Sequence, residues 1–229
     1  MNRILKVIML PLIVSNLFGQ GKKIFISADL EGVVGVVTGE QLGPSGFEYN
    51  RFRKFMTAEV NAAIQAAKDA GATEILVADS HGNGQNLLIE KLPKDVQVIR
   101  SWPRPLGMME GIDASFDGVI FTGYHASTDN LEGVRAHTFS SSKLTSVKVN
   151  GQVMTEGSWN AAIAGHFGVP VIMVSGDDAA VKEVKSIIGN IEGAIVKESI
   201  SFHSAKSLHP EAAYDLIAEK TAYALSSIL

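Results

Sequence analysis

Residues 23–33 read KIFISADLEGV, an apolar run that ends in two carboxylates. The run 24–27 predicts a buried β-strand, and Asp29 and Glu31 follow it two positions apart. Alternate residues of an extended chain point to the same side, so both carboxylates would share one side of the strand end if the extended conformation persists. Like charges placed there repel each other and resist burial, and a nearby cation would explain the pair.

Outward from this stretch, short apolar runs alternate with helical patterns. Strands are predicted at 74–82, 96–101, 118–126 and 169–178, and helices at 58–70, 158–168, 179–189 and from about Pro210 to the end. Strands that alternate with helices predict a mostly parallel sheet with helices on both faces. Residues 146–154 alternate around Asn150-Gly151, which predicts an added antiparallel hairpin. The predicted fold class is therefore α/β.

The overall composition fits one compact domain. The chain has 229 residues, of which 46% are hydrophobic and 19% are charged, and its formal net charge is −4. It contains no basic block or stripe, which argues against nucleic acid as a partner. Cysteine is absent, so disulfides and thiolate metal ligands are excluded.

Residues 1–19 have the layout of a secretory signal peptide. Arg3 and Lys6 give a positive start, the apolar run 7–18 follows, and cleavage is expected near Gly19-Gln20. The run is short for a membrane span, and the alternative is an uncleaved N-terminal anchor. We expect residues 20–229 to form a single α/β domain that is periplasmic or secreted, with no stable membrane insertion after cleavage.

Polar side chains follow several of the predicted strands. Asp29 and Glu31 follow the first strand, His81 lies at the end of the second, His125 at the end of the fourth, and Glu156 follows the hairpin. Ligands of open α/β sheets bind outside the carboxyl ends of the strands. Carboxylates and imidazoles without thiolates suit Zn²⁺, with Mn²⁺, Co²⁺ or Fe²⁺ as alternatives. An aspartate such as Asp29 can bridge two ions about 3.5–4 Å apart, the spacing of two-metal hydrolytic sites.

Each of these residues also has a structural interpretation. Asp29 alone could cap a turn, and a single histidine is more often hydrogen-bonded in a core than bound to metal. The pattern over several strand ends favours the metal site. Asp177-Asp178 precedes a helix and is interpreted as its N-cap. The two tryptophans and ten phenylalanines are interpreted as core, and three further histidines as structural or exposed: His166, His203 and His209.

Several ordered motifs resemble the D-aminopeptidase family, the M55 metallopeptidases. They are SADLEG at 27–32, ADSHG at 78–82, GYHA at 123–126, MTEGSWNA at 154–161 and VPVIMVSGDD at 169–178, and segments 49–64 and 219–225 are also similar. The resemblance runs from Lys23 to the end of the chain. It implies a zinc aminopeptidase with two metals per site that acts on short peptides, some of them D-configured. It also implies ring-shaped homo-oligomers.

The resemblance assigns roles to individual residues. The family's metal ligands match, in order, Asp29, Glu31, His81, His125 and Glu156. A histidine proposed as catalytic in the family matches His137 in the segment GVRAHTF, which residue spacing alone does not single out. Two features depart from the family pattern: the export signal, and an end at Leu229 that lacks the family's C-terminal extension.

The sequence thus predicts a zinc-dependent aminopeptidase that hydrolyses the N-terminal peptide bond of short peptides through a two-metal site. One alternative is a metal-dependent phosphohydrolase of the haloacid dehalogenase type, because DLEGV and GDD superficially resemble its motifs. That chemistry needs an acid–base group, usually Asp, two residues after an aspartate nucleophile, where this chain has Glu31. A second alternative is a non-catalytic exported module that binds a metal or a peptide.

Overall fold

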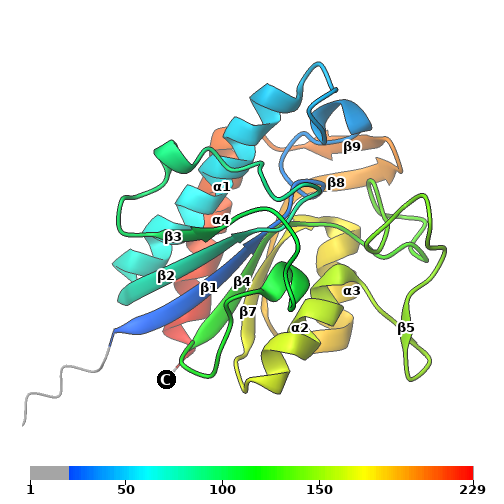
Figure 1. The fold of residues 1–229 in the computed structure, drawn as a ribbon. Coiled ribbons are helices and arrows are strands. Elements are labelled where there is room, and N and C mark those ends of the chain that lie inside the picture. Colours follow the sequence, from blue (N-terminus) through cyan, green and yellow to red (C-terminus); the bar gives the residue numbers. More distant parts are fainter. Residues whose placement is uncertain (1–20, 229) are drawn as a thin grey trace, which may run out of the picture.

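The computed structural model describes residues 21–228, and the predicted signal peptide, residues 1–19, lies outside the described residues. A seven-stranded sheet in the order β3-β2-β1-β4-β7-β8-β9 forms the centre of the molecule. Helices cover both of its faces (Figure 1). The predicted fold class, a mostly parallel α/β sheet, is confirmed.

Within this sheet, the neighbouring strands β3, β2, β1, β4, β7 and β8 pair in parallel. Only β9 at the edge runs antiparallel to its neighbour. Their bounds are β1 Lys22–Ala28, β2 Ala72–Asp79, β3 Gln97–Ile99, β4 Gly118–Tyr124, β7 Val171–Asp177, β8 Glu192–Ser201 and β9 Ser204–Ser207. The chain builds outward from β1 through β2 to β3, then returns to place β4 on the other side of β1. The order therefore reverses between β1 and β4, which is where open sheets of this kind bind ligands.

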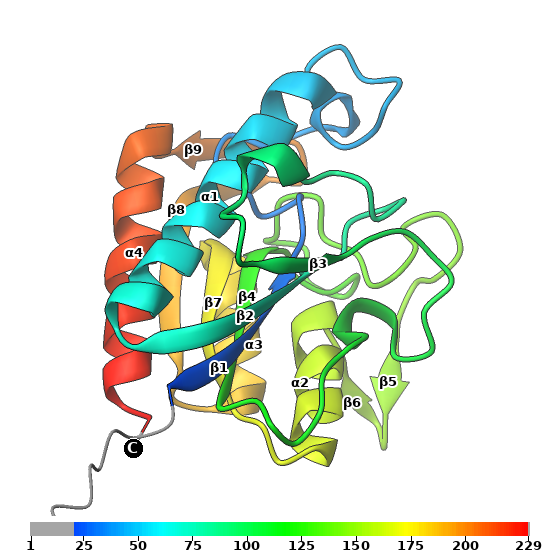
Figure 2. The same cartoon turned by 60° about the vertical axis from the view of Figure 1, so that its left-hand side comes forward.

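Two helices pack on each face of the sheet. Figure 2 shows α1 (Tyr49–Asp69) beside α4 (Pro210–Ser226) on one face and α2 (Glu156–His166) near the other, which α3 (Asp178–Ile188) also covers. Strand β1 explains this double cover, because Ile24 and Ile26 belong to one apolar core and Phe25 belongs to the other. Short 3₁₀ turns lie at Gly39–Gln41, Ile89–Lys91 and Gly107–Met109. Within the described part of the chain, no helix has both the length and the apolar character needed to cross a bilayer.

The predicted hairpin forms a separate two-stranded sheet of β5 (Lys148–Val149) and β6 (Gln152–Val153). Asn150 and Gly151 at its tip both have positive φ, as a tight hairpin turn of this type requires. The prediction for α1 was too short, because the helix begins at Tyr49 and not near residue 58. Its first turns are aromatic and charged instead of alanine-rich, yet Phe52 and Met56 are buried against the core.

The sequence pattern predicts no strand between the helix at 179–189 and the one that begins near Pro210, so the segment around His203 and His209 would be a polar connection. The structure corrects this, because that segment contains the second arm of a β8–β9 hairpin. Strand β8 is exposed at Ile195 and over most of its second half, and charged residues interrupt its apolar pattern. The histidine interpretations hold: His209 caps α4, and His203 is exposed. Asp177 caps α3 through its side chain, as predicted.

Candidate metal centre

The site lies at the carboxyl ends of β1, β2 and β4, around the reversal of strand order. Asp29 and His125 directly follow the neighbouring strands β1 and β4, and His81 lies two residues beyond the end of β2. Glu156 is the first residue of α2, whose N-cap is Thr155. The partial positive charge of a helix N-terminus favours a carboxylate at this position.

Glycines allow the segments after β1 and β4 to approach each other closely. The Gly32 N–H donates to the Gly123 carbonyl at 2.7 Å, and the Asp29 N–H donates to the Thr122 carbonyl at 2.8 Å. A Cβ on Gly32 would stand 2.0 Å from the Tyr124 carbonyl oxygen. A side chain at position 32 would therefore push apart the two segments that carry Asp29 and His125, which explains the glycine in SADLEG.

All five predicted ligands meet at this place, and Asp29 stands in the middle. Asp29 Oδ1 is 3.2 Å from His81 Nδ1, and Asp29 Oδ2 is 3.4 Å from His125 Nε2. A second carboxylate faces each histidine: Glu31 Oε2 lies 2.9 Å from His81 Nδ1, and Glu156 Oε1 lies 3.4 Å from His125 Nε2. One aspartate thus joins two carboxylate–imidazole pairs.

In each histidine of the cluster, one ring nitrogen forms a hydrogen bond with a backbone carbonyl. The pairs are His81 Nε2 to Leu42 (2.7 Å), His125 Nδ1 to Ala126 (3.0 Å) and His137 Nδ1 to Arg135 (2.9 Å). A nitrogen that donates to a carbonyl carries the proton, so the other nitrogen of a neutral imidazole presents its lone pair. These lone pairs face carboxylate oxygens. The lone pairs and the negatively charged oxygens repel each other unless a cation or extra protons lie between them.

Two atoms of the cluster lack any hydrogen bond among the residues that the structure describes. They are Asp29 Oδ2 and His125 Nε2, and both are buried. A buried polar atom without a partner costs about 1–3 kcal/mol. A divalent cation would satisfy both atoms, and oxygen and imidazole ligands without thiolate suit zinc. The residues present therefore fit a divalent metal.

The pKa values of two histidines also indicate that the site favours a positive charge. Burial lowers the pKa of His81, but Glu31 and Asp29 outweigh it and raise that pKa well above its usual value. Burial likewise lowers the pKa of His125, and Glu156 and Asp29 raise it well above the usual value. Protons on these imidazoles can therefore take the place of a cation, so metal and protons compete for the same atoms.

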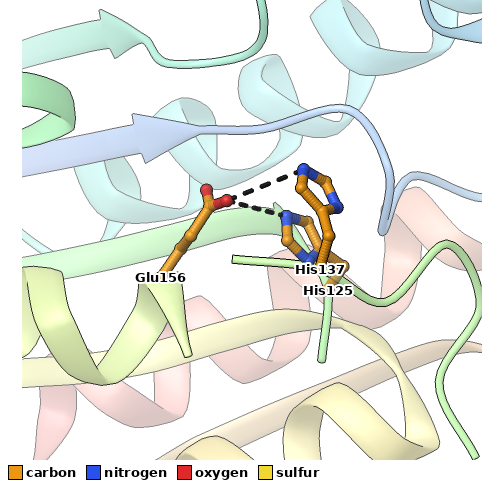
Figure 3. Close-up of side chains that lie close together, drawn as sticks. All are labelled: His125, His137 and Glu156. Carbon is orange, nitrogen blue, oxygen red and sulfur yellow. Dashed lines mark ion pairs between the residues drawn. The ribbon is translucent and has the colours of Figure 1, made fainter. Parts of the chain in front are cut away.

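His137 lies at the solvent-facing side of the same cluster. Its Nε2 is 3.9 Å from Glu31 Oε1 and 3.8 Å from Glu156 Oε1. Its ring stacks on that of His125, with centroids 4.1 Å apart, and Figure 3 shows both imidazoles facing Glu156. The side chain of His137 is 17% exposed, against 1% for His125. Only the motif resemblance identified this residue in the sequence, because it follows no strand.

The cluster opens into a cavity of about 330 Å³. Its walls include Trp102, Met108 and Phe139. The Phe139 N–H donates to Glu156 Oε1 at 2.7 Å, so this residue also helps to hold a predicted ligand. The interpretation of the tryptophans and phenylalanines as core was wrong here: Trp102 is 38% exposed and Phe139 is 45% exposed.

A buried lysine forms hydrogen bonds with backbone carbonyls of the segment after β1. Lys197 on β8 donates from Nζ to the carbonyls of Glu31 (2.5 Å), Val33 (3.0 Å) and Val36 (2.8 Å). All three N–H bonds of the ammonium are thereby used. Sequence reasoning missed this residue together with its strand.

The protein is thus an α/β protein with a buried carboxylate–imidazole cluster, a composition that holds divalent cations in hydrolytic enzymes. The family model described as D-aminopeptidase, peptidase family M55, matches residues 22–229. A D-aminopeptidase of Bacillus subtilis (strain 168) is 39% identical over 208 residues, which are 90% of this chain and 74% of the relative. The chain therefore belongs to the D-aminopeptidase family, as its motifs predicted.

A solved structure agrees with this assignment. It is the Zn-dependent D-aminopeptidase DppA from Bacillus subtilis, described as a self-compartmentalizing protease. The match has a TM-score of 0.85 and 38% identity, and it covers 89% of this chain and 74% of the solved one. The match of the family model, residues 22–229, includes every segment that carries the cluster.

Proposed function

We propose that this chain is a zinc-dependent aminopeptidase that hydrolyses the N-terminal peptide bond of short peptides, D-configured peptides included, with two metal ions. The observation that carries the proposal is the position of Asp29. Its two carboxylate oxygens face different histidines, and each histidine faces a further glutamate. The relatives named D-aminopeptidase and Zn-dependent D-aminopeptidase support the metal and the reaction.

The cluster divides naturally between two ions. His81 and Glu31 would hold one ion, His125 and Glu156 would hold the other, and Asp29 would bind both. Such ions, when bound, supply Lewis acidity that polarises a scissile carbonyl and lowers the pKa of water.

The residues of the chain have distinct tasks in this reaction. The hydrogen bond from His137 Nδ1 to Arg135 orients the ring, so that Nε2 faces the cavity and can take up or deliver a proton or stabilise an oxyanion. The Phe139 N–H fixes the orientation of the Glu156 carboxylate. A free substrate amine would pair with a carboxylate of this acidic cavity, which would explain a preference for chain ends.

The phosphohydrolase alternative is disfavoured by the surroundings of Asp29. A nucleophilic aspartate needs an oxygen free to attack phosphorus. Here Oδ1 accepts from the Leu30 N–H at 2.8 Å and faces His81, while Oδ2 faces His125. Three histidines and three carboxylates around one cavity fit zinc chemistry better than a magnesium-dependent phosphatase.

We also propose export and self-association. The N-terminal charge and hydropathy pattern supports a signal peptide, so the mature protein from its native host would begin near Gln20, which N-terminal sequencing can check. An intact Met1 in soluble protein would contradict it. The self-compartmentalizing relative supports a homo-oligomer.

The activity is tested with zinc-loaded protein on three substrates: a free-amine dipeptide, its N-acetylated form and p-nitrophenyl phosphate. We expect hydrolysis of the free-amine dipeptide alone. Cleavage of the phosphate ester instead would establish the phosphohydrolase alternative. Full metal occupancy without hydrolysis of a panel of L- and D-dipeptides would favour the binding module.

A further inference from the structure

A second cavity, of about 390 Å³, adjoins the cavity of the metal centre. The two share three lining residues: Trp102, Met108 and Phe139. Beyond them the second cavity is lined by Leu106, Trp159 and Ile163, among others. The two cavities are therefore neighbouring parts of one cleft, and we name the second part the aromatic pocket.

The walls of the aromatic pocket are apolar and open to solvent. Trp159 on α2 is 36% exposed and meets Phe139 edge to face, with ring centroids 5.4 Å apart. The guanidinium of Arg104 lies over the Trp102 ring at 4.3 Å, which holds that indole in place. Ligand pockets typically combine such apolar and aromatic walls with a few polar groups.

Hydrogen bonds connect the walls of the aromatic pocket to the segments that carry the predicted ligands. The Trp102 indole N–H donates to the Gly82 carbonyl at 2.8 Å, directly after His81. Phe139 donates its backbone N–H to Glu156, and its φ of 61° lies in the left-handed region that bulky residues avoid. A backbone strained in this way persists only where its surroundings hold it, and such residues cluster at functional sites.

We propose that the aromatic pocket binds a large apolar side chain of the peptide substrate, on a residue that flanks the cleaved bond. The inference rests on the proposed aminopeptidase function and adds the substrate class to it. A bound peptide with its scissile carbonyl at the metal centre has its flanking side chains within reach of the shared walls. The volume falls in the range of about 300–1,000 Å³ typical of small-molecule pockets, ample for a leucine or phenylalanine side chain.

The kinetic test compares zinc-loaded protein on Phe-Gly with Ala-Gly and on Gly-Phe with Gly-Ala, each in L and D configurations. We expect kcat/KM to favour phenylalanine by about tenfold or more in one series, since differences in apolar contact typically give about 10–200-fold. Trp159→Ala should lower this ratio about tenfold, and Ile163→Trp, which fills the pocket, should lower it as well. Tyr223→Ala is the matched control, because it removes an exposed aromatic residue from α4 on the opposite face.

A binding measurement separates the pocket from catalysis. The chain has two tryptophans, and both line the aromatic pocket. Titration with free phenylalanine should therefore change the tryptophan fluorescence saturably, while alanine at the same concentrations should not. The response should be lost in Ile163→Trp and retained in Tyr223→Ala.

The outcomes distinguish the two proposals. Hydrolysis with a phenylalanine-to-alanine ratio near one in both series, and no fluorescence response, would overturn the aromatic pocket and leave the proposed function intact. A saturable response without hydrolysis of any peptide would support the pocket and overturn the aminopeptidase. An unchanged ratio in Trp159→Ala together with loss of the oligomer in size-exclusion chromatography would assign this face to assembly and overturn the pocket.

Discussion

Asp29, directly after the end of β1, lies between the two carboxylate–imidazole pairs of the site. The sequence predicted that five candidate ligands would lie together. Four of them follow parallel strands, whose carboxyl ends deliver such residues to one edge of a sheet, and the fifth, Glu156, begins α2. Spacing could not predict His137, Phe139 or Trp102, because they lie on irregular segments whose course depends on tertiary contacts. The structure brings these residues to the same cavity as Asp29.

Replacing Asp29 tests the bridging role that we propose for it. Asp29→Ala removes both oxygens that face His81 and His125, so we expect zinc content to fall toward zero and peptidase activity to be lost together. Metal analysis of the purified variant measures the first effect. Full zinc occupancy in Asp29→Ala would remove this residue from the bridging position.

Replacing His137 separates a catalyst from a ligand. If this imidazole acts on the transition state, His137→Ala should retain zinc and lower kcat by about 10²–10⁴-fold for a lost acid–base group, or about 10²–10³-fold for a lost oxyanion donor. Zinc analysis and kcat are measured on the same preparation. A joint fall of zinc and rate would make His137 a ligand, and a change of less than a few-fold in both would end its catalytic role.

The histidine protons predict how stability depends on pH. In the metal-free protein the carboxylates raise the pKa values of His81 and His125, so the folded state binds their protons more tightly than the unfolded state. This stabilisation is fully present below about pH 6.5, the unfolded pKa, and is lost as the pH rises through the folded values. Zinc replaces these protons, so the difference in Tm between zinc-loaded and metal-free protein should grow from pH 6 to pH 8. A difference that shrinks over this range would contradict the competition.

Strand β8 is an element that the sequence did not predict, in contrast to most of the other strands of the sheet. Strands β1, β4 and β7 are mostly apolar runs buried on both faces, and β2 becomes one after the exposed residues Thr73 and Glu74. The positions of these four strands followed from the sequence alone. Strand β8 carries a buried lysine, Lys197, in a pattern that alternates poorly. Lysine is almost never fully buried unless it is paired, so a sequence pattern places such a residue on the surface. Its partners are carbonyls of the segment after β1, which only the folded chain brings together.

The connection between β8 and the metal centre gives a prediction for Lys197→Met. The substitution leaves the carbonyls of Glu31 and Val36 without this donor, while the Val33 carbonyl still accepts from the Val36 N–H at 3.1 Å. Each buried carbonyl left unpaired costs about 1–3 kcal/mol. We expect a clear loss of unfolding free energy, measured by denaturant titration. We also expect about 10–100-fold weaker zinc binding in a chelator competition, the usual effect of losing a group that orients a ligand.

The matched control for this change is Lys206→Met on the neighbouring strand β9. Lys206 forms an ion pair with Glu198 at 3.1 Å, and both side chains are mostly exposed. Exposed pairs of this kind contribute about 0–1 kcal/mol, so this variant should retain its stability and its zinc affinity. Equal zinc affinity in Lys197→Met and Lys206→Met would show that β8 does not position the metal centre.

At the scale of the whole molecule, the sheet places two carboxylate–imidazole pairs on either side of one aspartate. The reversal of strand order between β1 and β4 makes this possible, because the segments that follow the two strands can face each other there. The glycine contacts bring those segments together, and Lys197 forms hydrogen bonds with the segment that follows β1. We therefore propose that the domain binds two ions that share Asp29.

Anomalous diffraction from crystals of zinc-soaked protein, recorded on both sides of the zinc absorption edge, can count and locate the bound ions. We predict two zinc peaks per chain about 3.5–4 Å apart, one beside His81 and Glu31 and one beside His125 and Glu156, with Asp29 between them. A single peak at full occupancy, or two peaks that do not share Asp29, would show that Asp29 does not bridge two ions.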